Sequence, residues 1–134
     1  EGPDAIDLMI CDVVMPGISG KDLHDPNGKD DFVNPGTMKL PVGRPVIVDV
    51  ASKDVIHNLA LVPMRAAQDA TPGVKAHMWF KPVKEGTWDI ICGQLCGPGH
   101  AQMKAVLEVM PAKDFEDWSK EMSANAAKKA AEAK

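Results

Sequence analysis

Between Thr37 and Met110, short apolar runs alternate with turn-forming residues along the chain. In the run RPVIVDVAS, Val46, Val48 and Val50 recur at every second position, which is the period of a half-buried strand. Runs of this length and spacing predict an all-β fold, either a sandwich or a barrel. The expected strands lie in TMKLPVG, RPVIVDVAS, DVIHNLALV, VKAHMWF, TWDIIC and MKAVLEVM, and a loop is expected after the third run through Pro72-Gly73.

The N-terminal part of the chain differs in character from this central region. Residues 1–23 contain one apolar run, Ile6 to Val14, which predicts an atypical N-terminal strand that ends in a turn. Residues 24–36 are expected to form a loop, because Pro, Asn and Gly gather there. The β domain is therefore expected at residues 37–111.

Residues 112–134 predict a C-terminal helix or tail. Ala, Lys and Glu dominate this segment, and Phe115, Trp118 and Met122 recur at helical spacing. These three side chains are expected to dock the first turns of the helix on the sandwich. The Ala/Lys-rich end is expected to fray.

Composition narrows the possible functions. The 134 residues suit one domain, and the formal net charge is −4 without any stripe of Lys or Arg. Nucleic-acid binding is therefore not expected, whereas an acidic surface suits a basic protein partner. Eleven Gly and eleven Pro argue against an all-helical protein. No run of about 18 apolar residues is present, so no membrane span is expected, and no signal peptide is visible.

The stretch CGQLCGPGHAQM, residues 92–103, gathers two thiols, an imidazole and a thioether between two expected strands. Its glycines and proline disfavour a helix. Thiolate, imidazole and thioether are soft or borderline ligands, and this combination favours copper over magnesium, calcium or structural zinc. Cys92, Cys96, His100 and Met103 are therefore candidate copper ligands.

A second imidazole, His57, falls within the expected apolar strand DVIHNLALV, where a polar ring needs a partner. It could be a core histidine that is hydrogen-bonded to the backbone. The copper-like loop elsewhere in the chain favours a metal ligand instead. For the loop itself, the alternative is a Cys92–Cys96 disulfide in a surface turn.

Four stretches, SKDVIH, QDATPG, MWFKPVKEGTWDIIC and CGQLCGPGHAQM, resemble the copper domain of cytochrome c oxidase subunit II. The resemblance covers roughly residues 37–120, and its most specific part is C-x-x-x-C-x-x-x-H-x-x-M with an upstream D-V-x-H. It implies a cupredoxin-like Greek-key β-sandwich that holds two copper ions in a binuclear CuA centre.

The resemblance also implies a ligand set. The thiolates of Cys92 and Cys96 would each bridge both coppers. The other four ligands would divide between the two ions, His57 with Met103 on one and His100 with the backbone carbonyl of Gln94 on the other.

By the same resemblance, the domain would accept electrons from cytochrome c and pass them to the haem-copper subunit I of a terminal oxidase. It would form no bond itself and would face the periplasm, attached to the membrane through a region that this chain lacks. Two alternatives remain open. One is the CuA domain of another redox enzyme, of the nitrous oxide reductase type, and the other is a copper carrier or mononuclear cupredoxin.

The sequence departs from the family pattern in two places. Position 94 is Gln where many members carry a Glu that reaches a magnesium ion; Gln keeps the backbone carbonyl but lacks the carboxylate. The aromatic-rich strand at which electrons from cytochrome c are thought to enter is also missing, because the chain has no Tyr and its first Trp is Trp79.

In place of that strand, IDLMICDVVMPGISGKDL weakly resembles the phospho-acceptor segment of a response-regulator receiver domain, with Asp12 as the acceptor. A working receiver also needs an acidic pair upstream and Thr/Ser and Lys positions downstream. Nothing in the chain supplies them, so phosphorylation of Asp12 is not expected. The simpler interpretation is an edge strand in which Cys11 is a small buried residue.

Other polar and aromatic residues are given ordinary roles. Trp79 and Trp88 are expected in the core, and His77 is expected on a strand face without a ligand role. Asp69 is expected to cap a turn in the QDATPG loop, with an interface contact as the alternative. The acidic loop residues Asp25, Asp30 and Asp31 are expected to be solvated, with docking of cytochrome c as the alternative.

Overall fold

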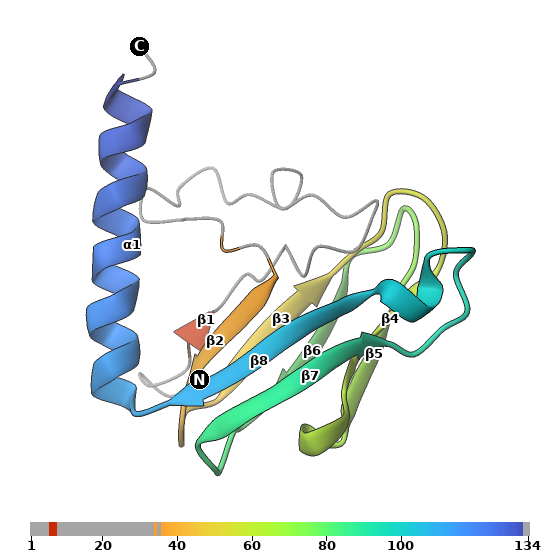
Figure 1. Cartoon of the computed structure of the whole chain (residues 1–134), viewed down its shortest axis with the longest axis horizontal. Coiled ribbons are helices and arrows are strands. Elements are labelled where there is room, and N and C mark those ends of the chain that lie inside the picture. The colour runs from red at the N-terminus through yellow and green to blue at the C-terminus, as the bar shows by residue number, and fades with distance from the viewer. Residues whose placement is uncertain (1–5, 8–33, 35, 133–134) are drawn as a thin grey trace.

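A computed structural model describes residues 6–7, 34 and 36–132 of the chain. Within these residues, two β-sheets stack against each other and one long helix stands beside them (Figure 1). The strands are β1 (Ile6–Asp7), β2 (Thr37–Pro41), β3 (Val46–Val50), β4 (His57–Leu61), β5 (Ala66–Ala70), β6 (Ala76–Phe80), β7 (Gly86–Cys92) and β8 (Lys104–Met110). The helices are the 3₁₀ turns η2 (Val62–Met64) and η3 (His100–Gln102) and the α-helix α1 (Ala112–Glu132).

The core lies between the two sheets, and alternation along the strands builds it. In β3, Val46, Val48 and Val50 are buried while Ile47 between them is exposed. β8 repeats the pattern across the core, where it buries Ala105, Leu107 and Val109. Each sheet thus turns one apolar face inward, and the cupredoxin-like β-sandwich with a C-terminal helix that the sequence predicted is confirmed.

Strand order brings distant parts of the sequence to one end of the sandwich. The larger sheet runs β2-β8-β7-β4-β5, and the smaller runs β1-β3-β6. β7 is antiparallel to both of its neighbours, β8 and β4. The last residue of β7 therefore lies at the same end as the first residues of β4 and β8. That end carries the metal-ligand candidates.

The helix α1 is attached at the edge of the larger sheet, beside β2 (Figure 1). Phe115 is buried, and its ring contacts that of Trp118 with centroids 5.7 Å apart. The Lys39 ammonium lies 5.3 Å from the Trp118 ring centroid, and Arg44 pairs with Glu116 at 3.1 Å. The first turns of the helix therefore dock as expected.

Two details of the predicted fold were wrong. The segment expected to be a loop before Pro72 contains β5, an edge strand whose small and polar residues pair with β4. Trp79 is not in the core, because 77% of it is exposed on the outer face of β6. Edge strands and outer faces need no apolar period, so the hydrophobic pattern could not identify either one.

Several predictions concern residues outside the described part of the chain. Of the receiver-like segment, the structure describes only Ile6 and Asp7, which pair in parallel with β3. Cys11, Asp12 and the acidic residues Asp25, Asp30 and Asp31 lie outside the described residues. Among the residues that are described, no helix is long and apolar enough to cross a membrane.

Candidate metal centre

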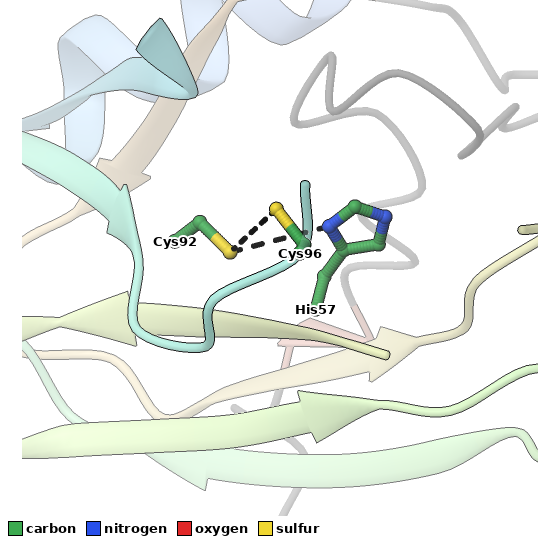
Figure 2. A group of neighbouring side chains, drawn as sticks. All are labelled: His57, Cys92 and Cys96. Atoms are coloured by element: carbon green, nitrogen blue, oxygen red, sulfur yellow. Dashed lines mark hydrogen bonds between the residues drawn. The ribbon is translucent and has the colours of Figure 1, made fainter. Parts of the chain in front are cut away.

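Two strand ends and one loop converge at the candidate centre. His57 is the first residue of β4, and Cys92 is the last residue of β7. The loop between β7 and β8 carries Cys96 and returns through η3, which begins at His100. Figure 2 shows the His57 ring and the two thiols pointing toward one another.

The two thiols and the His57 ring form the inner part of the cluster. The Sγ atoms of Cys92 and Cys96 lie 3.8 Å apart, and Nδ1 of His57 lies 4.0 Å from Sγ of Cys92. One ligand atom from each of these three residues lies within 4.8 Å of the other two. Both cysteines are free thiols, because a disulfide requires a sulfur separation of about 2 Å.

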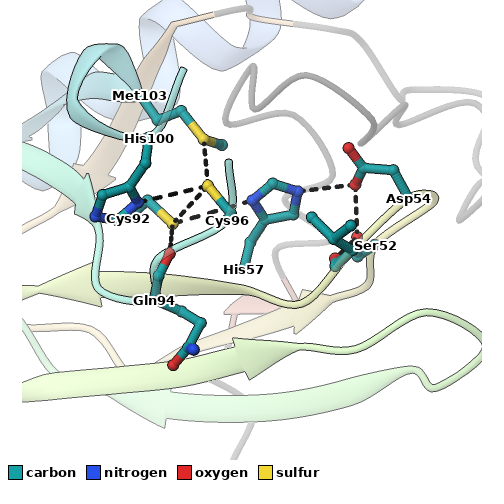
Figure 3. A network of polar contacts seen from close by, with 9 residues as sticks. Ser52, Asp54, His57, Cys92, Gln94, Cys96, His100 and Met103 are labelled. Atoms are coloured by element: carbon teal, nitrogen blue, oxygen red, sulfur yellow. Dashed lines mark hydrogen bonds and ion pairs between the residues drawn. The ribbon is translucent and has the colours of Figure 1, made fainter. Parts of the chain in front are cut away.

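The three remaining candidates contact the same two sulfurs (Figure 3). The backbone carbonyl of Gln94 lies 3.1 Å from Sγ of Cys92. Nδ1 of His100 lies 3.4 Å from Sγ of Cys96, and the Met103 sulfur lies 3.1 Å from it. All six residues that the sequence proposed as ligands are thus brought together, and their ligand roles remain a prediction.

The backbone of the loop explains how His100 and Met103 return to Cys96. Gly97 has a φ of 138°, a conformation that L side chains rarely adopt. Its carbonyl accepts a hydrogen bond from the His100 N–H at 3.1 Å, and the His100 carbonyl accepts one from Met103 at 3.2 Å. This tight turn places His100 and Met103 on the same side as the thiols.

A hydrogen-bonded chain behind His57 fixes the orientation of its ring (Figure 3). Nε2 of His57 lies 2.8 Å from the Asp54 carboxylate, which accepts a further bond at 3.1 Å from the Ser52 hydroxyl. In the neutral ring, a proton on Nε2 that is donated to Asp54 would leave the lone pair of Nδ1 facing the thiols. Carboxylates behind a ligand histidine commonly play this role.

The sequence reasoning gave no role to Asp54 or Ser52, which support the His57 ring. Asp54 stands in the motif D-V-x-H, three residues before His57, and that spacing was the available signal. In this motif Asp54 could contact His57 across a local turn or could bond a residue elsewhere in the fold. The motif alone therefore gave Asp54 no role.

The electrostatics of the thiol pair favour one thiolate before the other. Burial alone would raise the pKa of Cys92, but backbone hydrogen bonds at Asn58 and Gln94 and the nearby imidazoles lower it to about 7. Burial raises the pKa of Cys96, and the charge on Cys92 raises it further. Two neighbouring thiolates repel each other, so a cation between them would stabilise both.

The pKa of His57 shifts in the opposite direction to that of Cys92. Burial alone would lower its pKa, but the hydrogen bonds to Asp54 and Cys92 raise it above the ordinary value. The pKa of Asp54 is lowered, first by a backbone hydrogen bond at Val55 and then by the His57 ring. The ring is only 2% exposed, so its charge depends on these two partners rather than on water.

The donor set fits a soft metal. It combines two thiols, two imidazole Nδ1 atoms, a thioether and one carbonyl, which suits copper better than a hard cation. His57, Cys92 and Met103 are buried, so a bound ion would be shielded from water on their side.

Other residues that the sequence singled out lie away from these donor atoms or take different roles. His77 is exposed on the face of β6, as expected for a strand-face residue, and bonds the Asp49 carboxylate. Trp88 is half-buried against the core. Asp69 does not cap a turn; it lies on β5 and accepts a 2.7 Å hydrogen bond from the Asn58 side chain.

The fold and the site together define a cupredoxin-like domain with a cluster of sulfur and imidazole ligands. Residues 18–110 match the model of the cytochrome c oxidase subunit II periplasmic domain. The chain belongs to this family. Membership implies copper binding, and His57, Cys92 and Cys96 form a cluster that could hold a metal ion.

Individual relatives agree with this assignment. The alternative cytochrome c oxidase subunit 2 of Bradyrhizobium diazoefficiens is 39% identical over 74% of this chain and 36% of its own length. The periplasmic domain of cytochrome oxidase subunit II (CoxB) of Bradyrhizobium japonicum matches with a TM-score of 0.63 and 32% identity, over 75% of this chain and 72% of that one. A chain of a heme-copper terminal oxidase dimer matches with a TM-score of 0.53 and 32% identity, over 56% of this chain and 51% of that one.

The chain spans about a third of the length of the curated relatives it matches. Its membership places it among the components of oxidase complexes.

Proposed function

We propose that this domain is a one-electron carrier that holds two copper ions in a CuA centre. The observation that carries the proposal is the meeting of four further donor groups around two thiols 3.8 Å apart. When bound there, a copper pair supplies one-electron redox chemistry with the electron shared through the sulfurs. The ligands would be His57, Cys92, the Gln94 carbonyl, Cys96, His100 and Met103.

The contacts place one imidazole beside each thiol, as a centre with two metal positions requires. Cys92 and Cys96 lie at the middle of the cluster, as bridging ligands must. His57 contacts Cys92 and His100 contacts Cys96, each through Nδ1, so each ring lies beside a different thiol. The Gln94 carbonyl and the Met103 sulfur are weaker donors, and as metal ligands they would tune the reduction potential.

The rigidity of the site supports an electron-transfer role. Fast electron transfer requires ligands that move little when the charge changes. Here Cys92 and His57 belong to paired strands, and Asp54 holds the His57 ring from behind. A reversible copper carrier would instead benefit from ligands that can leave.

We also propose cytochrome c as the electron donor and the haem-copper subunit I of a terminal oxidase as the acceptor, on the periplasmic side of the membrane. The surface near the centre supports docking to a protein. Leu95, between the two cysteines, is 78% exposed, and Val55 and Ile56 next to His57 are also exposed. Exposed apolar side chains around a buried redox site suit transient protein contacts.

Copper content and an electron paramagnetic resonance spectrum test the proposal. The chain would be reduced, loaded with copper, separated from free metal and then measured. Two coppers per chain, with hyperfine structure from one electron shared over two nuclei, would support the electron carrier. One copper with a single-nucleus pattern would contradict it and would favour a mononuclear cupredoxin or a copper carrier.

A further inference from the structure

Asn58, the second residue of β4, contacts the start of the metal loop, residues 93–103 between β7 and β8. It follows His57 directly, and β4 pairs with β7 only as far as the Leu59–Cys92 pair. One position farther on, the Gly93 N–H donates to the Asn58 carbonyl at 3.0 Å. A backbone hydrogen bond from Asn58 also reaches the Cys92 sulfur. By its backbone, Asn58 thus holds Cys92, the last residue of β7, and Gly93, the first residue of the loop.

The Asn58 side chain is held on the opposite side by β5. Its Nδ2 donates to Oδ1 of Asp69 at 2.7 Å, and these two residues are direct cross-strand partners. With Nδ2 engaged in this way, Oδ1 of Asn58 points at Gly93. A Cβ atom added to Gly93 would lie 2.5 Å from Oδ1, 3.1 Å from Cγ and 3.5 Å from Cβ of Asn58.

A contact of 2.5 Å is closer than real Cβ atoms come, so Gly93 fits here because it lacks a side chain. The Asn58 amide could rotate away only by giving up its bond to Asp69. The alternative is that the backbone at Gly93 moves, which would shift Cys92 and Gln94 on either side of it. The position of the Asn58 side chain therefore depends both on its bond to Asp69 and on the absence of a side chain at Gly93.

We propose that Asn58, held by Asp69, is a positioning residue that fixes the Cys92–Gly93–Gln94 turn, and that Gly93 provides the space for it. This rests on the proposed function, because the turn carries both a bridging thiolate and the weak carbonyl ligand. The Gln94 carbonyl lies 3.1 Å from the Cys92 sulfur, and a shift of Gly93 would change that approach. Asn58 would thereby influence how the electron is divided between the two metal positions.

Four forms of the 134-residue chain test the proposal: wild type, Gly93→Ala, Asn58→Ala and the double variant. The first readout is hydrogen exchange of the residue-93 amide in the metal-free, reduced protein. We expect Gly93→Ala to speed exchange about tenfold, because the clash breaks the bond to the Asn58 carbonyl. Asn58→Ala should speed it about threefold, and the double variant should match Asn58→Ala, because the added methyl then meets only Cβ.

The second readout is the copper hyperfine pattern of the loaded chain. Gly93→Ala should change the sharing of the electron between the two nuclei, and the double variant should return it toward the wild-type pattern. Gly99→Ala is the matched control, because a Cβ at Gly99 meets nothing within 4 Å. It should leave both readouts unchanged.

Two results would overturn the proposal: no effect of Gly93→Ala on either readout, or a double variant as perturbed as Gly93→Ala alone. If Gly93→Ala does not fold, Asp69→Ala replaces it, and it should speed exchange at residue 93 as much as Asn58→Ala does. If the wild-type chain holds no copper pair, the proposed function fails. The hydrogen-exchange results would still decide the role of Asn58.

Discussion

Among the residues that the structure describes, two histidine–aspartate pairs have very different surroundings. His57 bonds Asp54 through Nε2 at the buried end of the sandwich, and only 2% of it is exposed. His77 bonds Asp49 through Nδ1 on the outer face of the smaller sheet, where 64% of its side chain is exposed. In the first pair the free ring nitrogen faces two thiols, whereas the second pair is joined at its carboxylate by Lys75 at 2.8 Å.

The comparison shows that a carboxylate partner does not by itself make a histidine a metal ligand. Both rings have one. What differs is the environment of the other nitrogen, and that depends on which strand end the residue occupies. His57 begins β4 at the end where β7 delivers Cys92, whereas His77 lies within β6 and points away from the core.

The largest expected effect comes from removing the sulfur that His57 faces. Cys92→Ser should abolish the two-copper site, because a hydroxyl does not replace a bridging thiolate, and Cys96→Ser should do the same. Copper content and the hyperfine pattern measure this, with His77→Ala as a control that should bind copper like the wild type. Two coppers sharing an electron in Cys92→Ser would show that the ligand assignment is wrong.

The metal loop was readable from sequence because its information is local. Cys92, Cys96, His100 and Met103 lie within twelve residues on backbone that Gly97 forces to turn, so their spacing alone predicts that they meet. His57 comes from a strand 35 positions before Cys92, and only the copper-like chemistry of the loop and the family resemblance linked the two. The registers of β4 and β7 provide the physical reason.

The parts of the fold that sequence could not give are those without an apolar period. β5 has the sequence AAQDA, and it is a strand only because β4 pairs with it. Trp79 has the residue type of a core position, but β6 turns it outward, opposite the exposed Ile47 of β3. Which face of a strand is covered depends on the second sheet, and no local pattern in the strand specifies that.

The two aspartates provide the next test of the comparison. Asp54→Ala should weaken copper binding about 10- to 100-fold, because the His57 ring loses its orientation and its proton acceptor. Asp54→Asn should lose less, because its side-chain oxygen can still accept from Nε2. Asp49→Ala should leave copper affinity unchanged. Competition with a copper chelator measures all three affinities.

The same variants test whether Asp54 has only a structural role. If Asp54→Ala and Asp49→Ala lowered the melting temperature equally and neither changed copper affinity, the two pairs would be equivalent structural contacts. The interpretation of His57 as a ligand held by Asp54 would then be wrong.

A smaller effect is expected from replacing Met103, whose thioether is the weakest of the three sulfur donors. Met103→Leu replaces the thioether with a side chain of similar volume, so the buried packing should change little. Two coppers should remain bound, with a changed reduction potential and a changed electron distribution, because a weak thioether ligand would tune the potential more than it would hold the metal. Redox titration followed by visible absorption measures the potential. Loss of one copper instead would mean that Met103 is a principal ligand.

The smallest expected effect belongs to the exposed pair and disappears at acidic pH. Partial burial alone would raise the pKa of Asp49, but hydrogen bonds from Lys75 and His77, with their charges, hold it below the ordinary value of about 3.9. A carboxyl whose pKa is lowered by folding contributes stability above its unfolded pKa, and that contribution is lost as the pH falls through its lower folded pKa. Asp49→Asn should therefore lower the free energy of unfolding by about 1 kcal/mol or less at pH 7, and the difference from wild type should vanish near pH 2. Urea unfolding of the metal-free chain at both pH values measures it, and a difference that persists at pH 2 would mean that Asp49 stabilises the sheet by something other than its charge.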